Sequence, residues 1–359
     1  MPRALVIAPN WIGDAVMTEP LLRNLQASGL EIDVLATPWV SAVYKLFPSV
    51  SEVIQADFQH GFLQFKQRLM IAKSLKLNKY DQAYILPNSF KSLLIPLFAK
   101  IPNIFGYSGE LRNLFLTKSL PNPPKQQRPP MVEHYFNLSV LNPLNHQSHS
   151  LIHSHLPSLK IKEEDLLLAR GLFKNLFPLS TELFLLAPGA EFGPAKQWPY
   201  LHFQEFAALL LSEYPNAGIL IIGGPKDRAI GDRIIHHSHL SPMNSSSGSR
   251  IKNVCGEISL EQSFGLISIA QGLASNDSGI MHIGAALQIP QIAFFGSSDP
   301  KHTPPLSVFA KALWLGLECS PCHKRICPLG HLNCLNQITP ESALIALVNL
   351  TSKKRISDV

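Results

Sequence analysis

Short apolar runs alternate along the chain with longer segments in which apolar residues recur at helical spacing. In the first part of the chain, runs rich in Val, Ile and Leu lie at Ala4–Ala8, Ile32–Ala36 and Ala83–Leu86. Segments with helical spacing follow at Asp14–Gln26 and Ser89–Ala99. Short continuous apolar runs that alternate with amphipathic segments predict buried strands of a parallel sheet joined by helices.

The same alternation restarts in the second half of the chain. The Pro-rich segment Pro121–Pro130 predicts a loop, and the His-, Asn-, Ser- and Pro-rich stretch Asn142–Pro157 predicts the connection between two domains. Beyond it, the pattern predicts helices at Glu163–Leu176, Phe203–Glu213, Leu260–Ala270 and Gly279–Leu287, and strands at Leu183–Ala187, Gly218–Ile222, Gly272–Ser275 and Gln291–Phe294. We therefore predict an α/β fold of two Rossmann-like, doubly wound domains, residues 1–157 and 158–359, that face a central cleft.

Length and composition agree with two globular domains. The chain has 359 residues, and domains typically have about 100–200. Hydrophobic residues make up 46% of the chain and charged residues 16%, which supplies a large core and excludes wholesale disorder. No apolar run reaches the roughly 18 residues of a membrane-spanning helix. Because the N-terminus also lacks the features of a signal peptide, we expect a cytoplasmic protein.

The net charge of +6 lies entirely in the first third of the chain. Residues 1–130 carry 14 Lys and Arg against 8 Asp and Glu, whereas residues 131–359 carry 17 of each. Such an excess indicates an anionic partner for the N-terminal domain, either a phosphorylated substrate or a membrane surface. Nucleic acid ranks last because the chain has no arginine-rich tract and no nucleic-acid-binding module. A lysine-rich surface that is merely solvated fits the charge equally well.

The first candidate site follows the first predicted strand, because ligands of parallel sheets bind beyond the carboxyl ends of the strands. This turn contains Gly13 and Asp14. Gly13 stands alone and does not form the G-x-G-x-x-G fingerprint, which argues against an NAD-dependent oxidoreductase. From spacing alone, Asp14 is a helix cap more often than a general base that points into the cleft.

Two further strand-to-helix turns carry candidate chemistry in the second domain. The loop Pro188–Pro199 contains glycines and then Lys196, and its backbone N–H groups together with the lysine suit a diphosphate. The turn Ser275–His282 places small polar residues before a helix whose N-terminal amides attract an anion. Since Asp277 would repel phosphate, we expect it to bind backbone amides or a sugar hydroxyl. We expect His282 to be packed within the helix rather than catalytic.

Four cysteines cluster near the C-terminus with the spacing Cys319-x2-Cys322-x4-Cys327-x6-Cys334, and Cys255 stands alone. Two histidines, His323 and His331, lie among them. This spacing resembles a metal knuckle only loosely, and reduced thiols are the commoner outcome in a cytosolic protein. We expect no required metal.

Five motifs identify a family. They are Leu5–Asp14 (LVIAPNWIGD), Leu86–Ser92 (LPNSFKS), Pro188–Lys196 (PGAEFGPAK), Asn276–Gly279 with Met281–His282, and Phe295–Ser298 running on to Thr303–Pro305. Over nearly its whole length the chain resembles the ADP-heptose–lipopolysaccharide heptosyltransferases of glycosyltransferase family 9. The second and third motifs resemble the type II members in particular.

This resemblance implies a GT-B fold with the acceptor in the N-terminal domain and the donor in the C-terminal one. The implied reaction is inverting transfer of L-glycero-D-manno-heptose from ADP-heptose to the first heptose of the lipopolysaccharide inner core. The alternatives are a type I enzyme that acts on Kdo2-lipid A and a non-catalytic nucleotide-sugar-binding protein. Retention of both Asp14 and Lys196 argues against the latter.

The resemblance also implies roles for individual residues. Asp14 matches the proposed base, and Lys196 matches the lysine that contacts the donor phosphates. The expected donor-binding residues are Gly13, Gly189, Ala190, Glu191, Lys196, Asp227, Glu257, Ile258, Asn276, Asp277, Ser278, Gly279 and His282. The expected acceptor-binding residues are Asn88, Ser89, Lys91 and Arg112. We expect no required cofactor, with stimulation by divalent cations left open, and peripheral association with the inner face of the cytoplasmic membrane.

Overall fold

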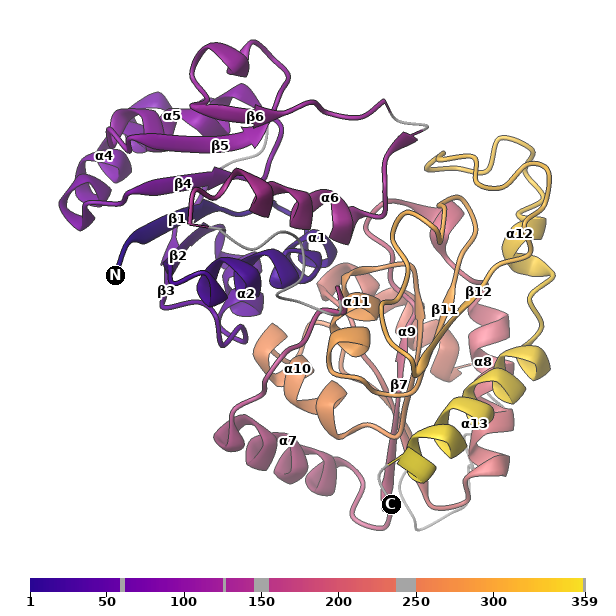
Figure 1. Cartoon of the computed structure of the whole chain (residues 1–359). Coiled ribbons are helices and arrows are strands. Elements are labelled where there is room, and N and C mark those ends of the chain that lie inside the picture. The colour runs from indigo at the N-terminus through magenta and orange to yellow at the C-terminus, as the bar shows by residue number, and fades with distance from the viewer. Residues whose placement is uncertain (59–61, 125–126, 145–154, 237–249, 358–359) are drawn as a thin grey trace. The chain divides into compact units, whose positions relative to one another are not determined.

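The computed structural model of the chain describes residues 1–58, 62–124, 127–144, 155–236 and 250–357 (Figure 1). These residues form two compact units, Met1–Lys160 and Ile161–Val359. The predicted boundary after residue 157 falls slightly early, because Ser158 N–H donates to Glu19 Oε2 (3.2 Å) and Lys160 N–H donates to Leu46 O (3.1 Å) within the first unit. Residues 145–154 of the predicted connection, and residues 125–126 of the predicted Pro-rich loop, lie outside the described residues.

The first unit contains a six-stranded sheet in which every pair is parallel, with the order β3-β2-β1-β4-β5-β6. Its strands are β1 Arg3–Ile7, β2 Glu31–Ala36, β3 Glu52–Gln55, β4 Gln82–Ile85, β5 Asn103–Tyr107 and β6 Lys118–Leu120. Its helices are α1 Ile12–Met17, α2 Glu19–Ala27, α3 Pro38–Tyr44, α4 Phe65–Leu75, α5 Phe90–Phe98 and α6 Met131–Phe136, with shorter 3₁₀ turns at η1 Lys76–Asn78, η2 Arg112–Leu114 and η4 Asn137–Leu141. The strand order reverses between β1 and β4, where such sheets bind ligands.

The second unit repeats this plan with the order β12-β11-β10-β7-β8-β9, again with every pair parallel. Its strands are β7 Glu182–Ala187, β8 Ala217–Ile221, β9 Ile251–Asn253, β10 Gly272–Asn276, β11 Gln291–Phe294 and β12 Ala310–Leu313. Its helices are α7 Glu163–Leu176, α8 Tyr200–Glu213, α9 Arg228–His236, α10 Leu260–Ile269, α11 Gly279–Ala286, α12 Asn333–Asn336 and α13 Pro340–Ser357, with η5 Pro194–Lys196 and η6 Pro225–Asp227. The reversal here lies between β7 and β10.

The predicted α/β architecture is confirmed, and one helix was predicted wrongly. The segment Asp14–Gln26 forms two helices, α1 and α2, rather than one. The break falls at Thr18, because Pro20 has no N–H to donate and is tolerated only in the first turn of a new helix. The prediction also missed the short strands β3, β5, β6, β9 and β12, which have three to five residues each and carry weak sequence patterns.

The core of the second unit fixes the loop that follows β7. Trp198 is fully buried and its ring stacks on Phe294 of β11 with centroids 3.9 Å apart. Its indole Nε1 donates to Ile338 O at 2.9 Å, so the one polar group of the side chain is satisfied. Because Trp198 lies two residues after Lys196, this core contact anchors the backbone that carries the lysine.

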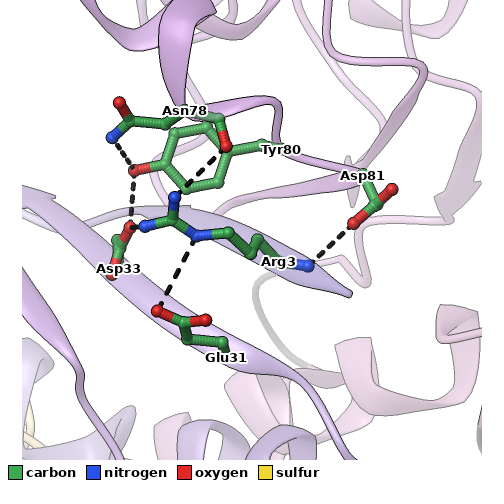
Figure 2. Close-up of polar contacts among 6 residues, drawn as sticks. All are labelled: Arg3, Glu31, Asp33, Asn78, Tyr80 and Asp81. Atoms are coloured by element: carbon green, nitrogen blue, oxygen red, sulfur yellow. Dashed lines mark hydrogen bonds and ion pairs between the residues drawn. The ribbon is translucent and has the colours of Figure 1, made fainter. Parts of the chain in front are cut away.

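A buried polar network joins the amino ends of the central strands in the first unit (Figure 2). Asp33 of β2 is fully buried and its Oδ2 accepts hydrogen bonds from Arg3 Nη2 (2.6 Å) and Tyr80 Oη (2.7 Å). Arg3 also donates from its backbone N–H to Asp81 Oδ2 at 2.8 Å. The network lies at the edge of the sheet opposite the carboxyl ends. Because ligands of parallel sheets bind at the carboxyl ends, we infer that the network stabilises the fold.

We expect Asp33→Ala to lower the free energy of unfolding of the first unit by about 2–3 kcal/mol, because two hydrogen bonds to the carboxylate are lost and one of them comes from the charged Arg3 guanidinium. Glu31→Ala is the matched control. Its carboxylate is 41% exposed and 3.8 Å from Arg3 Nε, so its loss should change stability by less than about 1 kcal/mol. Calorimetric unfolding of both variants checks this, and equal effects would contradict the assigned role.

Candidate functional site

Lys196 and Asp277 form a buried ion pair at the carboxyl edge of the second sheet. Lys196 ends η5, in the loop after β7, and Asp277 directly follows β10. Lys196 Nζ donates to Asp277 Oδ2 at 2.5 Å, and Ser298 Oγ donates to the same oxygen at 2.5 Å. The partners of Asp277 within the protein are therefore a lysine and a serine hydroxyl rather than the backbone amides that the sequence led us to expect, whereas its contact with a sugar hydroxyl stays a prediction. A carboxylate that is 6% exposed needs a compensating charge, and Lys196 supplies it.

Asn276 holds the Lys196 loop at both ends. Its Oδ1 accepts from Trp198 N–H at 2.9 Å, and its Nδ2 donates to Pro188 O at 2.7 Å. The side chain is fully buried. With its amide engaged on both sides, Asn276 positions the loop, and its expected part in donor binding stays a prediction.

The amino end of α11 lies beside this ion pair in sequence. Ser278 is the N-cap in an extended conformation, and its hydroxyl makes no capping hydrogen bond. Within the described part of the chain Ser278 Oγ is buried and has no hydrogen-bond partner. Gly279 begins the helix, whose first N–H groups form a ready anion site with the positive end of the helix dipole.

His282 lies in α11 and is 5% exposed, so it is packed as predicted. Burial lowers its pKa to about 4, with a smaller contribution in the same direction from Lys196 and an opposing one from Asp277. The imidazole is therefore neutral at pH 7, and its expected place among the donor-binding residues stays a prediction.

Asp227 lies where the loops after β7 and β8 meet. Its Oδ2 accepts from Gly224 N–H at 2.9 Å. A Cβ at Gly189 would lie 2.4 Å from the Asp227 carboxyl carbon, so glycine is required for the two loops to approach this closely. Burial raises the pKa of Asp227, which the Gly224 N–H opposes. The carboxylate is half-buried at the carboxyl edge of the sheet, and its expected role in donor binding stays a prediction.

The other predicted carboxylates of this edge form exposed ion pairs. Glu191 pairs with Lys226 at 2.7 Å, and Glu257 pairs with Arg228. Their exposed side chains contribute little to stability and stay accessible to a ligand. Ala190, which is buried, and Ile258, which is half-buried, lie in the same two loops.

In the first unit, Gly13 and Asp14 lie in the first turn of α1 at the carboxyl end of β1. The N-cap is Trp11, so the interpretation of Asp14 as a capping residue is wrong. Asp14 is half-buried, and its charge adds to the burial that raises the pKa values of Tyr44 and Tyr135. The carboxylate thus lies beside two buried phenols, close to the edge where a ligand would bind.

The predicted acceptor-binding residues divide into two groups. Asn88, Ser89 and Lys91 follow β4 and lead into α5, whose N-cap is Ser89. Arg112 is fully buried, so it lies inside the unit rather than on its surface, and its expected contact with the acceptor stays a prediction.

Arg112 instead supports this turn from within the unit. Its Nη1 donates to Pro87 O at 2.8 Å and to Asn88 Oδ1 at 3.5 Å. Gly106 leaves room for it, since a Cβ there would lie 2.7 Å from Nη2. Burial lowers the pKa of Arg112.

Sequence reasoning missed Ser298 and Arg68. Ser298 lies inside a family motif, but nothing local links it to Asp277. Arg68 of α4 is 5% exposed and shares the buried face of the helix with Ala72 and Leu75. Ala72 and Leu75 follow Arg68 at helical spacing, four and seven residues later, so Arg68 occupies a position of the apolar face. A charged residue at such a position is the signal that could have identified it.

The cysteine-rich segment supports the Lys196 loop. Arg325 O accepts from Ala195 N–H at 3.0 Å, and His323 N–H donates to Ser297 O at 2.7 Å. All five cysteines are free thiols. Among the described residues, no group of three or more His, Cys, Asp or Glu side chains is arranged to hold a metal ion.

Comparison with known proteins decides the family. A family profile described as glycosyltransferase family 9 (heptosyltransferase) matches residues 68–333. The chain belongs to this glycosyltransferase family. Lipopolysaccharide heptosyltransferase 2 of Salmonella typhimurium is 36% identical to it over 99% of this chain and 100% of the relative. The Escherichia coli K12 protein of the same name is also 36% identical, over 95% and 96% of the two chains.

Solved structures agree with this membership. The structure of Escherichia coli ADP-heptose lipopolysaccharide heptosyltransferase II matches the chain with a TM-score of 0.81 and 35% identity, covering 98% of this chain and 99% of the other. Two parallel sheets of this kind, each flanked by helices, correspond to the GT-B architecture that the sequence predicts.

We expect the stability of the second unit to fall as the pH is lowered from about 6.5 to about 4. Across this window the unfolded imidazole of His282 binds a proton, at its ordinary pKa of 6.5, whereas the folded one stays neutral until about pH 4. The unfolded state therefore gains protons first, and the loss reaches up to about 3 kcal/mol. Thermal unfolding of His282→Gln at several pH values should show a flatter profile than the wild type. Parallel profiles would exclude His282 as the cause.

Proposed function

We propose that this family 9 enzyme transfers L-glycero-D-manno-heptose from ADP-heptose to the first heptose of the lipopolysaccharide inner core. Its relatives named lipopolysaccharide heptosyltransferase 2 align over nearly the whole of both chains. The observation that carries the proposal is the Lys196–Asp277 pair beside the amino end of α11, because it joins a cation to a helix N-terminus where a nucleoside diphosphate would bind.

In the second unit, the loop after β7 and the first N–H groups of α11 bind the diphosphate of the donor. Lys196 is 18% exposed at its side chain and has ammonium protons left after the bond to Asp277, so it stabilises negative charge as the glycosidic bond breaks. Asp227 accepts from a ribose hydroxyl, and the segment that includes Ile258 borders the adenine.

In the first unit, Asp14 removes the proton of the attacking hydroxyl. That oxygen then bonds to the anomeric carbon as the bond to the diphosphate breaks, which inverts the anomeric centre. Because a nucleoside diphosphate is a good leaving group, the reaction needs no general acid, unlike glycoside hydrolysis. We propose that no metal or organic cofactor is required.

Asp14→Asn should lower kcat about 10²- to 10⁴-fold, because the base is lost while its size is kept. The assay is ADP release from ADP-heptose with a delipidated acceptor that already carries one heptose. Binding of ADP-heptose, measured by calorimetry, should not change. Asp57→Asn, an exposed carboxylate of the same unit, is the control and should keep wild-type kcat.

The acceptor series separates this proposal from its alternatives. Turnover only with the heptosylated acceptor supports it. Turnover on the bare Kdo acceptor would establish the type I reaction instead. Binding of ADP-heptose without turnover on either acceptor would favour a nucleotide-sugar-binding protein.

We further propose that the outer side of α4, together with the residues just before it, attaches the enzyme to the cytoplasmic membrane. This membrane face consists of Phe62, Leu63, Phe65, Met70, Lys66 and Lys73. Its four apolar side chains are 49–65% exposed, and the chain has no acidic residue from 58 to 80. Apolar and basic side chains on one surface are typical of proteins that lie on anionic lipid. No helix among the described residues is long and apolar enough to span a bilayer.

Replacing Phe62, Phe65 and Met70 together by Ser should weaken binding to anionic vesicles at least about tenfold, since each apolar side chain contributes about 1.5–3 kcal/mol when fully buried. Co-sedimentation with phosphatidylglycerol vesicles at low salt measures this. The control replaces three exposed leucines of the second unit, Leu167, Leu168 and Leu179. Equal loss in the two triple variants, or no binding by the wild type, would refute the membrane face.

A further inference from the structure

A pocket of about 100 Å³ lies at the carboxyl ends of β1, β2 and β4, where the strand order of the first sheet reverses. Ile7 and Leu35 belong to its apolar lining, and Thr37, Arg68 and Lys91 are among its polar lining residues. A pocket at such a reversal is the usual ligand position in an open parallel sheet.

The Arg68 guanidinium is held rigidly at this pocket. Nε donates to Leu63 O at 2.7 Å and Nη1 donates to Lys91 O at 3.1 Å. The guanidinium carbon lies 4.1 Å from the centre of the Phe58 ring. The hydrogen bonds of the guanidinium to described residues come from Nε and Nη1, so Nη2 is left for a ligand.

The charge of Arg68 is not balanced within the described part of the first unit. No Asp or Glu described there forms an ion pair with Arg68, although only 5% of the residue is exposed. Burial lowers its pKa accordingly. A buried cation that retains its charge without a carboxylate partner favours an anionic ligand.

A second polar group at the pocket also lacks a partner. Thr37 is 6% exposed, and its Oγ1 is buried without a hydrogen-bond partner among the described residues. Lys91 adds a further cation from the first turn of α5. Buried hydroxyls are normally hydrogen-bonded, so an unpartnered hydroxyl on a residue that lines the same pocket as two cations indicates a missing acceptor group.

Trp39 gives the pocket an aromatic wall. Its ring is 48% exposed, and its Nε1 donates to Asn10 O at 3.0 Å, which fixes the orientation of the ring. An exposed, immobilised aromatic face suits the apolar side of a sugar ring.

We propose that this pocket binds an anionic group of the acceptor sugar, a phosphate or a carboxylate, through Arg68, Thr37 and Lys91, with the sugar ring against Trp39. This inference rests on the proposed function and names the part of the acceptor that the first unit recognises. Arg68 is its main anion-binding residue, because its guanidinium is pre-positioned and pairs with oxyanions at two points. The volume suits one such group and part of a sugar, and is smaller than that of a typical nucleotide site.

The test compares KM for three delipidated, heptosylated acceptors: intact, dephosphorylated, and with the sugar-acid carboxylates methyl-esterified. We expect Arg68→Gln to raise KM for the intact acceptor about 10- to 100-fold and to leave KM for ADP-heptose within about twofold. The modified acceptor that lacks the bound anion should have a high KM with the wild type and show no further rise with Arg68→Gln. This identifies the group as phosphate or carboxylate.

Two conservative variants keep the test decisive if Arg68→Gln fails to fold. Arg68→Lys should give an intermediate KM for the acceptor, and Thr37→Val should raise it about 2- to 10-fold. Lys118→Gln, an exposed cation on β6, is the charge control. The inference is overturned if wild-type turnover is normal and the Arg68 variants keep the wild-type acceptor KM, or raise both KM values equally. Absence of wild-type turnover on the intact acceptor would refute the proposed function instead.

Discussion

The parallel direction of every strand pair in both sheets is the constraint on which the rest of the structure depends. It brings all strand-to-helix turns of a unit to one edge, where Asp14 and the Leu86–Ser92 motif both lie in the first sheet. In the second sheet it brings Lys196 to Asp277. The amino edge is left for stabilising contacts such as the Asp33 network. Chemistry and stability are thereby separated within each sheet.

Buried charged side chains are compensated in two different ways. One is an ion pair with a carboxylate, and the other is hydrogen bonding to backbone carbonyls. Lys196 and Asp277 neutralise each other, so a cation is held ready for a diphosphate without the cost of an isolated buried charge. Arg112 and Arg68 instead donate to backbone carbonyls and have no carboxylate partner among the described residues. Arg112 is sealed beneath the turn after β4 and supports it. Arg68 lines a pocket, and the same lack of a partner makes it a recognition group there.

Helix α4 links two of the proposed roles through its two sides. The buried side contributes Arg68 to the pocket, and the exposed side contributes most of the membrane face, whose Phe62 and Leu63 lie just before the helix. A single helix of 11 residues would thus contact the lipid surface with one side and the lipid-anchored acceptor with the other. The remaining specificity then depends on the turns around the pocket, which β1, β2 and β4 fix.

The sequence by itself determined the fold class, the family and the turns that carry the chemistry. Helix α7 and strand β11 were predicted to the residue, because hydrophobic period is a local property that packing did not override. Tertiary structure alone decided what each polar side chain of those turns contacts. Lys196 and Asp277 are 81 residues apart, Asn276 and Pro188 are 88 apart, and Arg112 and Pro87 are 25 apart. Spacing along the chain places a residue on a turn, but only the packing of distant segments determines whether its charge is paired, buried or open to a ligand.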